Sequence, residues 1–190
     1  MKKKILVCAL IAICLSIAAY STVAYDTYNA KATNVITVGN IKIKLVQSSV
    51  KAGENTPSFN VENEFSIQPG SEISKTVQVE NVGNNPAWIR IDVKKVIELA
   101  EGVREEANID LIGFDVDTEA WTLKDGYYYY NEALEPGETT PPLFTKIQFS
   151  TEMGNIYQKS KARVDVKVHA VQAANNGDTV FDAAGWPADE

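Results

Sequence analysis

The chain has 190 residues, with 18 Lys+Arg, 25 Asp+Glu, one His and two Cys. This length fits one domain with a buried core. The acidic balance argues against a protein that coats nucleic acid or anionic lipid, because both would repel it. Both cysteines lie within the first 24 residues, so the rest of the chain lacks thiolate chemistry, Cys-type zinc sites and most His-dependent triads.

Residues 1–24 have the pattern of a secretory signal peptide. Three lysines precede an uncharged apolar run at 5–19, which is shorter than the roughly 20 residues that span a bilayer. Small side chains at Thr22 and Ala24 fit the −3 and −1 positions of a signal-peptidase site, so we expect cleavage before Tyr25. The secreted chain would then keep no stable membrane anchor, no Cys, and 15 basic against 25 acidic side chains, a net charge of −10.

Strand signals dominate the rest of the chain. Alternating or continuous apolar stretches predict strands at 35–38, 41–45, 59–61, 65–67, 73–80, 88–96, 111–116, 121–123, 127–130, 144–149 and 164–171. The polar stretch 81–86 is expected to join two antiparallel neighbours. Short helical turns are expected within 98–107 and 153–159.

Many short strands at close spacing predict an all-β fold, a jelly-roll-like antiparallel β-sandwich with one or two short helices. We expect four regions along the chain: 1–24 signal peptide, 25–34 N-terminal segment, 35–173 β-sandwich domain, and 174–190 acidic C-terminal tail. Two similar sequences, IQPG at 67–70 and LEPG at 134–137, each predict a Pro-Gly turn that feeds a strand.

The sequence offers little for catalysis. The single histidine, His169, alternates with valines and is expected on a solvated outer face together with Asp165 and Lys167. Zinc-protease, serine-hydrolase and P-loop motifs are absent from the sequence. We therefore predict no catalytic residue, no cofactor and no enzyme activity.

The best candidate for a metal site is the acidic stretch that contains Asp115, Asp117 and Glu119. Asp115 and Asp117 would lie on one face of a strand, and oxygen ligands suit calcium. The spacing of an EF-hand loop is absent. An acidic edge that discourages unwanted strand pairing explains the same residues more simply.

Four consecutive tyrosines form the least usual segment: Tyr127, Tyr128, Tyr129 and Tyr130. On a strand, two would point inward and two outward, so at least two rings would face solvent or a partner. Cross-strand aromatic pairing is one explanation, and an interface is the other.

Three blocks of sequence, from residue 19 to about 172, match a family pattern. The first contains AYSTVAYD at 19–26 and ATNVITVGNI at 32–41, the second FSIQPG at 65–70 with VQVENVGN at 77–84, and the third IQF at 147–149 with 164–172. Residues 98–142 match only in character. With these blocks the chain resembles the TasA/camelysin family of secreted Gram-positive proteins, whose signal peptides are processed by a SipW-type signal peptidase.

The resemblance implies a jelly-roll-like sandwich that self-associates into extracellular fibres of the biofilm matrix. In such fibres the mature N-terminal segment of one subunit adds as a strand to the next. Residues 25–33 lack Pro and Gly. The side chains of this assembly segment that would face a groove are Tyr28, Ala30 and Ala32 in one register, and Tyr25 and Thr27 in the other. A frayed terminus or the start of an intramolecular strand is the alternative for this segment.

Two other functions stay open. Some camelysin relatives carry a cell-surface metalloprotease label, but this sequence has one His and no zinc-ligand cluster. The other alternative is a non-polymerising accessory protein or adhesin that anchors the fibres of another matrix protein. All of these functions place the protein in the extracellular matrix or at the cell surface.

Overall fold

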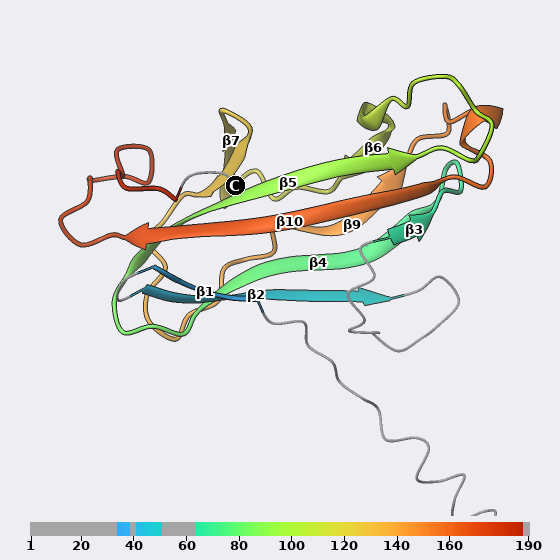
Figure 1. Cartoon of the computed structure of the whole chain (residues 1–190). Coiled ribbons are helices and arrows are strands. Elements are labelled where there is room, and N and C mark those ends of the chain that lie inside the picture. Colours follow the sequence, from blue (N-terminus) through green and yellow to red (C-terminus); the bar gives the residue numbers. More distant parts are fainter. Residues whose placement is uncertain (1–33, 39–40, 51–63, 188–190) are drawn as a thin grey trace, which may run out of the picture. The chain divides into compact units, whose positions relative to one another are not determined.

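The computed structural model describes residues 34–38, 41–50 and 64–187 (Figure 1). The predicted signal peptide, its cleavage site and the assembly segment lie outside these residues, as does the strand expected at 59–61. The described strands form two antiparallel sheets, which confirms the all-β prediction.

Each sheet has five strands within the described part of the chain. The first sheet runs in the order β1 (Asn34–Val38), β2 (Ile41–Val50), β4 (Glu72–Asn81), β9 (Phe144–Phe149) and β6 (Ile112–Phe114). The second sheet runs in the order β3 (Glu64–Ser66), β10 (Lys161–Gln172), β5 (Ala87–Glu98), β8 (Tyr127–Tyr130) and β7 (Trp121–Lys124).

The core lies between the two sheets and follows from the period-two pattern. Ile43 and Val77 from the first sheet and Ile89 and Val164 from the second are fully buried in one cluster. Burying each of these side chains contributes about 1.5–3 kcal/mol to folding. Their polar neighbours along each strand point to the outer faces.

The structure corrects the prediction for the stretch 81–86. The two strands that it joins, β4 and β5, lie in different sheets and do not pair with each other. Asn81 makes this crossover possible: its fully buried side chain donates from Nδ2 to Asn85 O (2.9 Å) and Leu134 O (2.8 Å). Its Oδ1 accepts from Gly83 N at 3.0 Å. Period-two alternation identifies a strand but says nothing of its partner.

The helical predictions are half right. Residues 98–107 form no helix, and a turn from Ala100 to Val103 lies there instead. A short 3₁₀ helix, η1, follows at Ile109–Leu111, where the Asn108 side chain accepts from Asp110 N. The second, η2 (Asn155–Tyr157), lies inside the predicted 153–159.

The two Pro-Gly turns share one geometry. Gly70 and Gly137 have φ of 75° and 82°, which Gly adopts without the strain of a Cβ. The residue after each glycine, Ser71 or Glu138, donates its N–H to the carbonyl three residues earlier. This is the arrangement of a type II turn with Pro at its second position.

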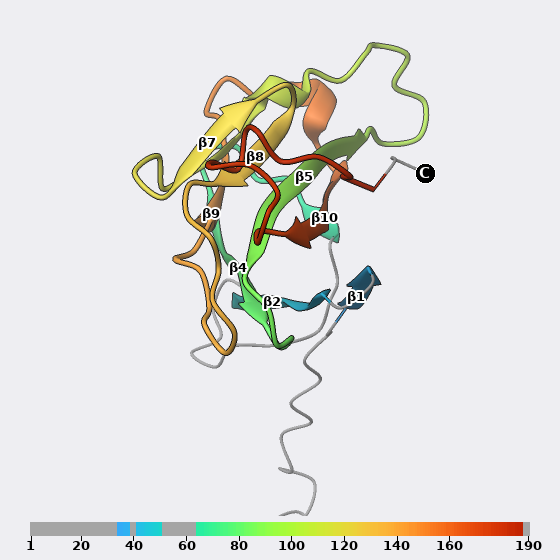
Figure 2. The same ribbon diagram turned by 90° about the vertical axis from the view of Figure 1, so that its left-hand side faces the viewer.

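The last described residues cover the outer face of the second sheet. Residues 173–187, which we call the C-terminal strap, run across β5, β8 and β10 as the red trace in Figure 2. Val180 of the strap is buried against a second, smaller cluster formed by Trp88, Tyr129 and Val171.

Candidate functional site

Part of the backbone of both sheets has no strand partner on one side of the molecule. β10 pairs with β5 along its whole length but with β3 only at 161–163. β2 pairs with β1 only at 41–45, although its pairing with β4 continues to Val50. Two stretches therefore have no paired strand on their outer side among the described residues: 164–172 of β10 and 46–50 of β2. We call these two stretches the open flank; β10 lies beside β1 and β2 there.

At one end of the open flank, the interior behind it contains two polar side chains, those of Lys75 and Gln47. Lys75 of β4 is 3% exposed, and burial lowers the pKa of its amine to about 8, although Asp165 acts in the opposite direction. Its Nζ lies 3.4 Å from Val164 O and 5.6 Å from the centroid of the Phe65 ring. The buried Oε1 of Gln47 has no hydrogen-bond partner within the described ranges. Buried polar groups at this end of the sandwich therefore have fewer hydrogen bonds than they could make, whereas the centre of the core is apolar.

The opposite flank is finished by a side chain. β6 pairs with β9 only at 147–149, and beyond it Asp115 takes over. The Asp115 carboxylate accepts from Thr145 N (2.8 Å), Lys146 N (2.6 Å) and Thr145 Oγ1. Partial burial acts to raise the pKa of Asp115, but these hydrogen bonds outweigh it and lower the pKa below its ordinary value. The carboxylate thus occupies backbone donors that another strand would otherwise use.

Two of the three residues predicted for calcium have carboxylates that accept hydrogen bonds from the backbone of the protein itself. Besides Asp115, the Asp117 carboxylate caps a turn by accepting from Glu119 N (3.0 Å) and Ala120 N (3.2 Å). The structure does not bring the three acidic side chains into one ligand set. Within residues 34–38, 41–50 and 64–187 no group of three His, Cys, Asp or Glu side chains is placed to hold a metal ion.

The four tyrosines alternate as predicted. Tyr128 and Tyr130 pack against the main core, and Tyr130 lies 5.4 Å from Trp121 of the neighbouring strand, measured between ring centroids. Tyr127 and Tyr129 point to the outer face, where Tyr129 is 8% exposed. The expectation that both outward rings face solvent or a partner is wrong for Tyr129, because the C-terminal strap covers it.

The prediction of a solvated His169 is also wrong. His169 lies on the outer face of β10, as the alternation indicates, yet it is only 2% exposed. Its Nδ1 lies 3.4 Å from Arg90 Nη2, and its ring meets the Tyr127 ring at 5.9 Å. Arg90 itself is stacked between the rings of Tyr127 (3.9 Å) and Trp186 (4.8 Å). The strap follows β10 directly and folds back over this face, where Pro187 and Trp186 contact Arg90. The strand pattern alone does not reveal this fold-back.

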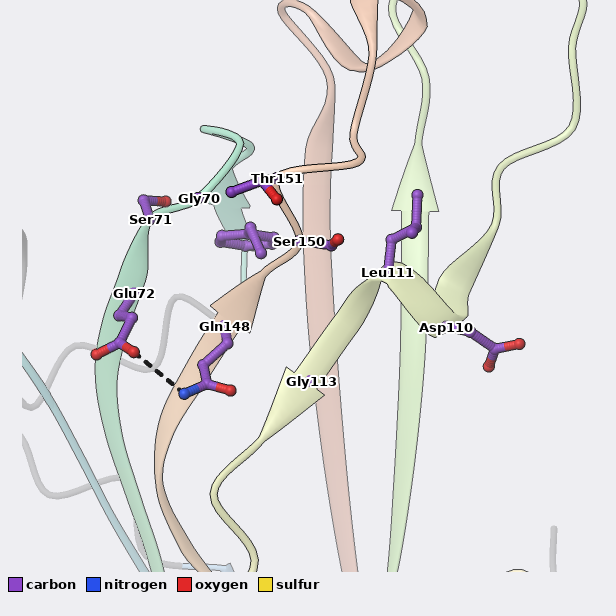
Figure 3. A pocket seen from close by; sticks show the side chains of 10 residues that line it. Gly70, Ser71, Glu72, Asp110, Leu111, Gly113, Gln148, Ser150 and Thr151 are labelled. Atoms are coloured by element: carbon purple, nitrogen blue, oxygen red, sulfur yellow. Dashed lines mark hydrogen bonds between the residues drawn. The ribbon is translucent and has the colours of Figure 1, made fainter.

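A hollow of about 400 Å³ lies at the far end of β4, β6 and β9 (Figure 3). The Glu72 carboxylate on its wall is already bound by Lys146 Nζ (3.0 Å) and Gln148 Nε2 (3.1 Å). Asp110, on the other wall, directs its carboxylate away from Glu72 in this view. The polar groups of the hollow therefore do not converge on one point, and we assign it no chemistry.

Comparisons with known proteins found no match to this chain among family models, curated proteins or solved structures. In the part of the chain that the structure describes, no helix has the length and apolar character needed to span a membrane. The functional proposal rests on the open flank, which follows from the pairing of the described strands.

Proposed function

We propose that this protein is a secreted structural subunit of extracellular biofilm-matrix fibres that donates its N-terminal strand to the next subunit. The open flank is the observation that supports this proposal. Along 164–172 of β10 and 46–50 of β2, backbone N–H and C=O groups have no strand partner among the described residues, and such groups form a template for an added strand. Proteins usually shorten or cover such edges, and the edge of β9 is covered by Asp115.

The wiring of the strands supports the jelly-roll-like form of the sandwich, which belongs to the same proposal. The chain moves from β2 in the first sheet to β3 in the second, back to β4, and across again to β5. Jelly rolls are built from two sheets with such Greek-key connections. A strand added beside β10 would extend the second sheet, and one added beside β2 would extend the first.

The fibre proposal also rests on the resemblance of residues 19–41 to secreted fibre subunits. A segment such as 25–33, with no Pro or Gly, is compatible with the extended backbone of a donated strand. Main-chain hydrogen bonds would supply the affinity, and alternate side chains such as Tyr28 and Ala30 would supply the register.

The first test compares secreted protein that begins at residue 25 with a form that begins at residue 34. We expect filaments in electron micrographs and rapid sedimentation for the longer form, and a monomer for the shorter one. Identical behaviour of the two forms contradicts strand donation. A monomer that coats the filaments of another protein without growing its own would instead identify an accessory subunit.

A point variant avoids any effect of shortening the chain. Ala30→Pro removes a backbone N–H and fixes φ in the segment, which an interior strand does not tolerate. Ala30→Ser is the matched control, because it changes the side chain but keeps the backbone donor. We expect filaments from Ala30→Ser and none from Ala30→Pro, and filaments from both would refute the assigned segment.

A further inference from the structure

The C-terminal strap contains Asn176-Gly177, the one Asn-Gly pair in the sequence. Asparagine followed by glycine is chemically labile, because glycine has no side chain to shield its backbone nitrogen from the asparagine amide carbon. In this protein the side chain of Asn176 also holds the strap together.

Asn176 connects four parts of the strap and sheet. Its Nδ2 donates to Gln172 O (2.9 Å) and Ala184 O (3.1 Å), and its Oδ1 accepts from Ala184 N (2.9 Å). Its backbone carbonyl accepts from Trp88 Nε1 at 3.0 Å. The side-chain amide of Asn176 thus joins the end of β10 to residues 184–187, which we call the far limb of the strap. The backbone carbonyl of Asn176 joins the strap to β5.

The limb that Asn176 holds carries the aromatic anchor of the strap. Trp186 lies over the Arg90 guanidinium and meets the Tyr129 ring at 5.9 Å. Arg90 Nη2 also donates to Pro187 O at 3.2 Å. Without this limb, the indole of Trp88 and the ring of Tyr129, now 7% and 8% exposed, would face water.

We propose that Asn176 is a self-modification site whose hydrolytic deamidation, in the undocked strap, prevents the C-terminal strap from docking again. The backbone nitrogen of Gly177 attacks Cγ of Asn176, a new N–Cγ bond forms, and the Cγ–Nδ2 bond breaks. The amide nitrogen leaves as ammonia with the proton of the Gly177 N–H. Water then opens the cyclic imide to aspartate or isoaspartate, so no oxidant or cofactor is involved.

Neither aspartate nor isoaspartate at position 176 can make the hydrogen bonds of the asparagine. A carboxylate has no N–H to give to the carbonyls of Gln172 and Ala184, so oxygen atoms would face oxygen atoms at hydrogen-bond distance. Isoaspartate also adds Cβ to the main chain, and the backbone carbonyl of residue 176 that accepts from Trp88 Nε1 becomes a free carboxylate beside the chain. Both products therefore favour the released strap.

The docked strap protects Asn176 from this reaction. Three hydrogen bonds fix the side-chain amide. Gly177 is held at φ 84°, with the space of a Cβ already taken by Asp182 at 2.8 Å. The reaction accordingly proceeds from the undocked strap, and its product does not dock again, so release becomes irreversible.

The test uses the full secreted chain with Asn176→Asp, which mimics the product. Asn175→Asp is the matched control: it adds the same charge one residue away, at φ 58°, where Asp is tolerated. We expect cleavage of the strap by a nonspecific protease to be about tenfold faster in Asn176→Asp than in wild type or control. The tryptophan emission of this variant should also shift to the red. Equal protection of all three proteins would overturn the proposal.

The second arm follows the reaction itself by peptide mass mapping in mildly alkaline buffer. Trp186→Ala undocks the limb without touching Asn176, so we expect the conversion of Asn176 to be about tenfold faster in Trp186→Ala than in wild type. Equal rates in the two proteins, or an amide that survives in both, would show that the strap does not control this site.

Discussion

The two flanks of the sandwich end their sheets in different ways. On one flank, the short strand β6 and the carboxylate of Asp115 cover the edge of β9. On the other, nine residues of β10 and five of β2 extend past the strands that pair with them in the described part of the chain. The same physical problem, an unpaired backbone, is therefore solved locally on one side and left to an added strand on the other.

This difference separates stability from assembly. The covered flank draws its donors and acceptors from within the subunit, so it needs no second chain. The open flank has a buried amine and an unsatisfied buried amide oxygen behind it, at Lys75 and Gln47. We therefore expect variants on the covered flank to act on folding, and variants of exposed residues on the open flank to act mainly on association.

A loss of stability is expected for Asp115→Ala, which uncovers the edge of β9. Asp115 is exposed, so we expect only about 1 kcal/mol of lost unfolding free energy at neutral pH. Urea unfolding measures it, with Asp110→Ala as the control, since the Asp110 carboxylate accepts no hydrogen bond from any described residue.

The stabilisation by Asp115 should depend on pH, because these hydrogen bonds favour the charged form of its carboxylate. The pKa of Asp115 in the folded protein lies below the ordinary 3.8, so its stabilisation is full above 3.8 and is lost as pH falls through the folded value. The difference between wild type and Asp115→Ala should shrink in strong acid. A difference that stays constant down to pH values well below 3.8 would contradict the assigned role.

An effect of opposite sign is expected for Lys75→Met. Holding a charged amine in a buried place behind the open flank costs stability, so the variant should be more stable than wild type by up to about 3 kcal/mol at neutral pH. Lys167→Met, an exposed lysine on β10, is the control.

The folded pKa of Lys75, about 8, lies below its ordinary value of 10.5. The unfolded chain then binds more protons between these two values, and wild-type stability rises across this window. The advantage of Lys75→Met should therefore vanish by about pH 10.5. A variant that is less stable than wild type at neutral pH would show that the amine is stabilising where it is.

The strands could be predicted from sequence because alternation reports directly on which face of a strand is buried. Predicted stretches such as 73–80 and 144–149 correspond to β4 and β9. Alternation carries no information on partners, which is why the crossover at 81–86 was wrongly expected to join neighbours. The signal that was missed is Asn81 with Gly83: a Cβ at Gly83 would lie 3.0 Å from Lys42 N.

The candidate site was less predictable than the strands. The open flank depends on where β3 and β1 stop pairing, and this is a property of register that no local pattern contains. His169 contacts Arg90 and Tyr127 of neighbouring strands, and the strap then folds back over Arg90, neither of which the local pattern of β10 contains. Asp115 was identified as an acidic edge residue, but its hydrogen bonds to Thr145 and Lys146 span thirty residues of sequence.

The most direct test of strand donation uses the absence of cysteine after residue 24. Ala30→Cys on the N-terminal segment is combined with Ser48→Cys or Lys167→Cys on the open flank, or with Lys124→Cys on the distant edge strand β7 as the control. We expect disulfide-linked subunits in oxidised filaments for the flank positions and none for Lys124→Cys. Cross-linking through β7 alone, or filaments in which no flank position is ever linked, would contradict strand donation into the open flank.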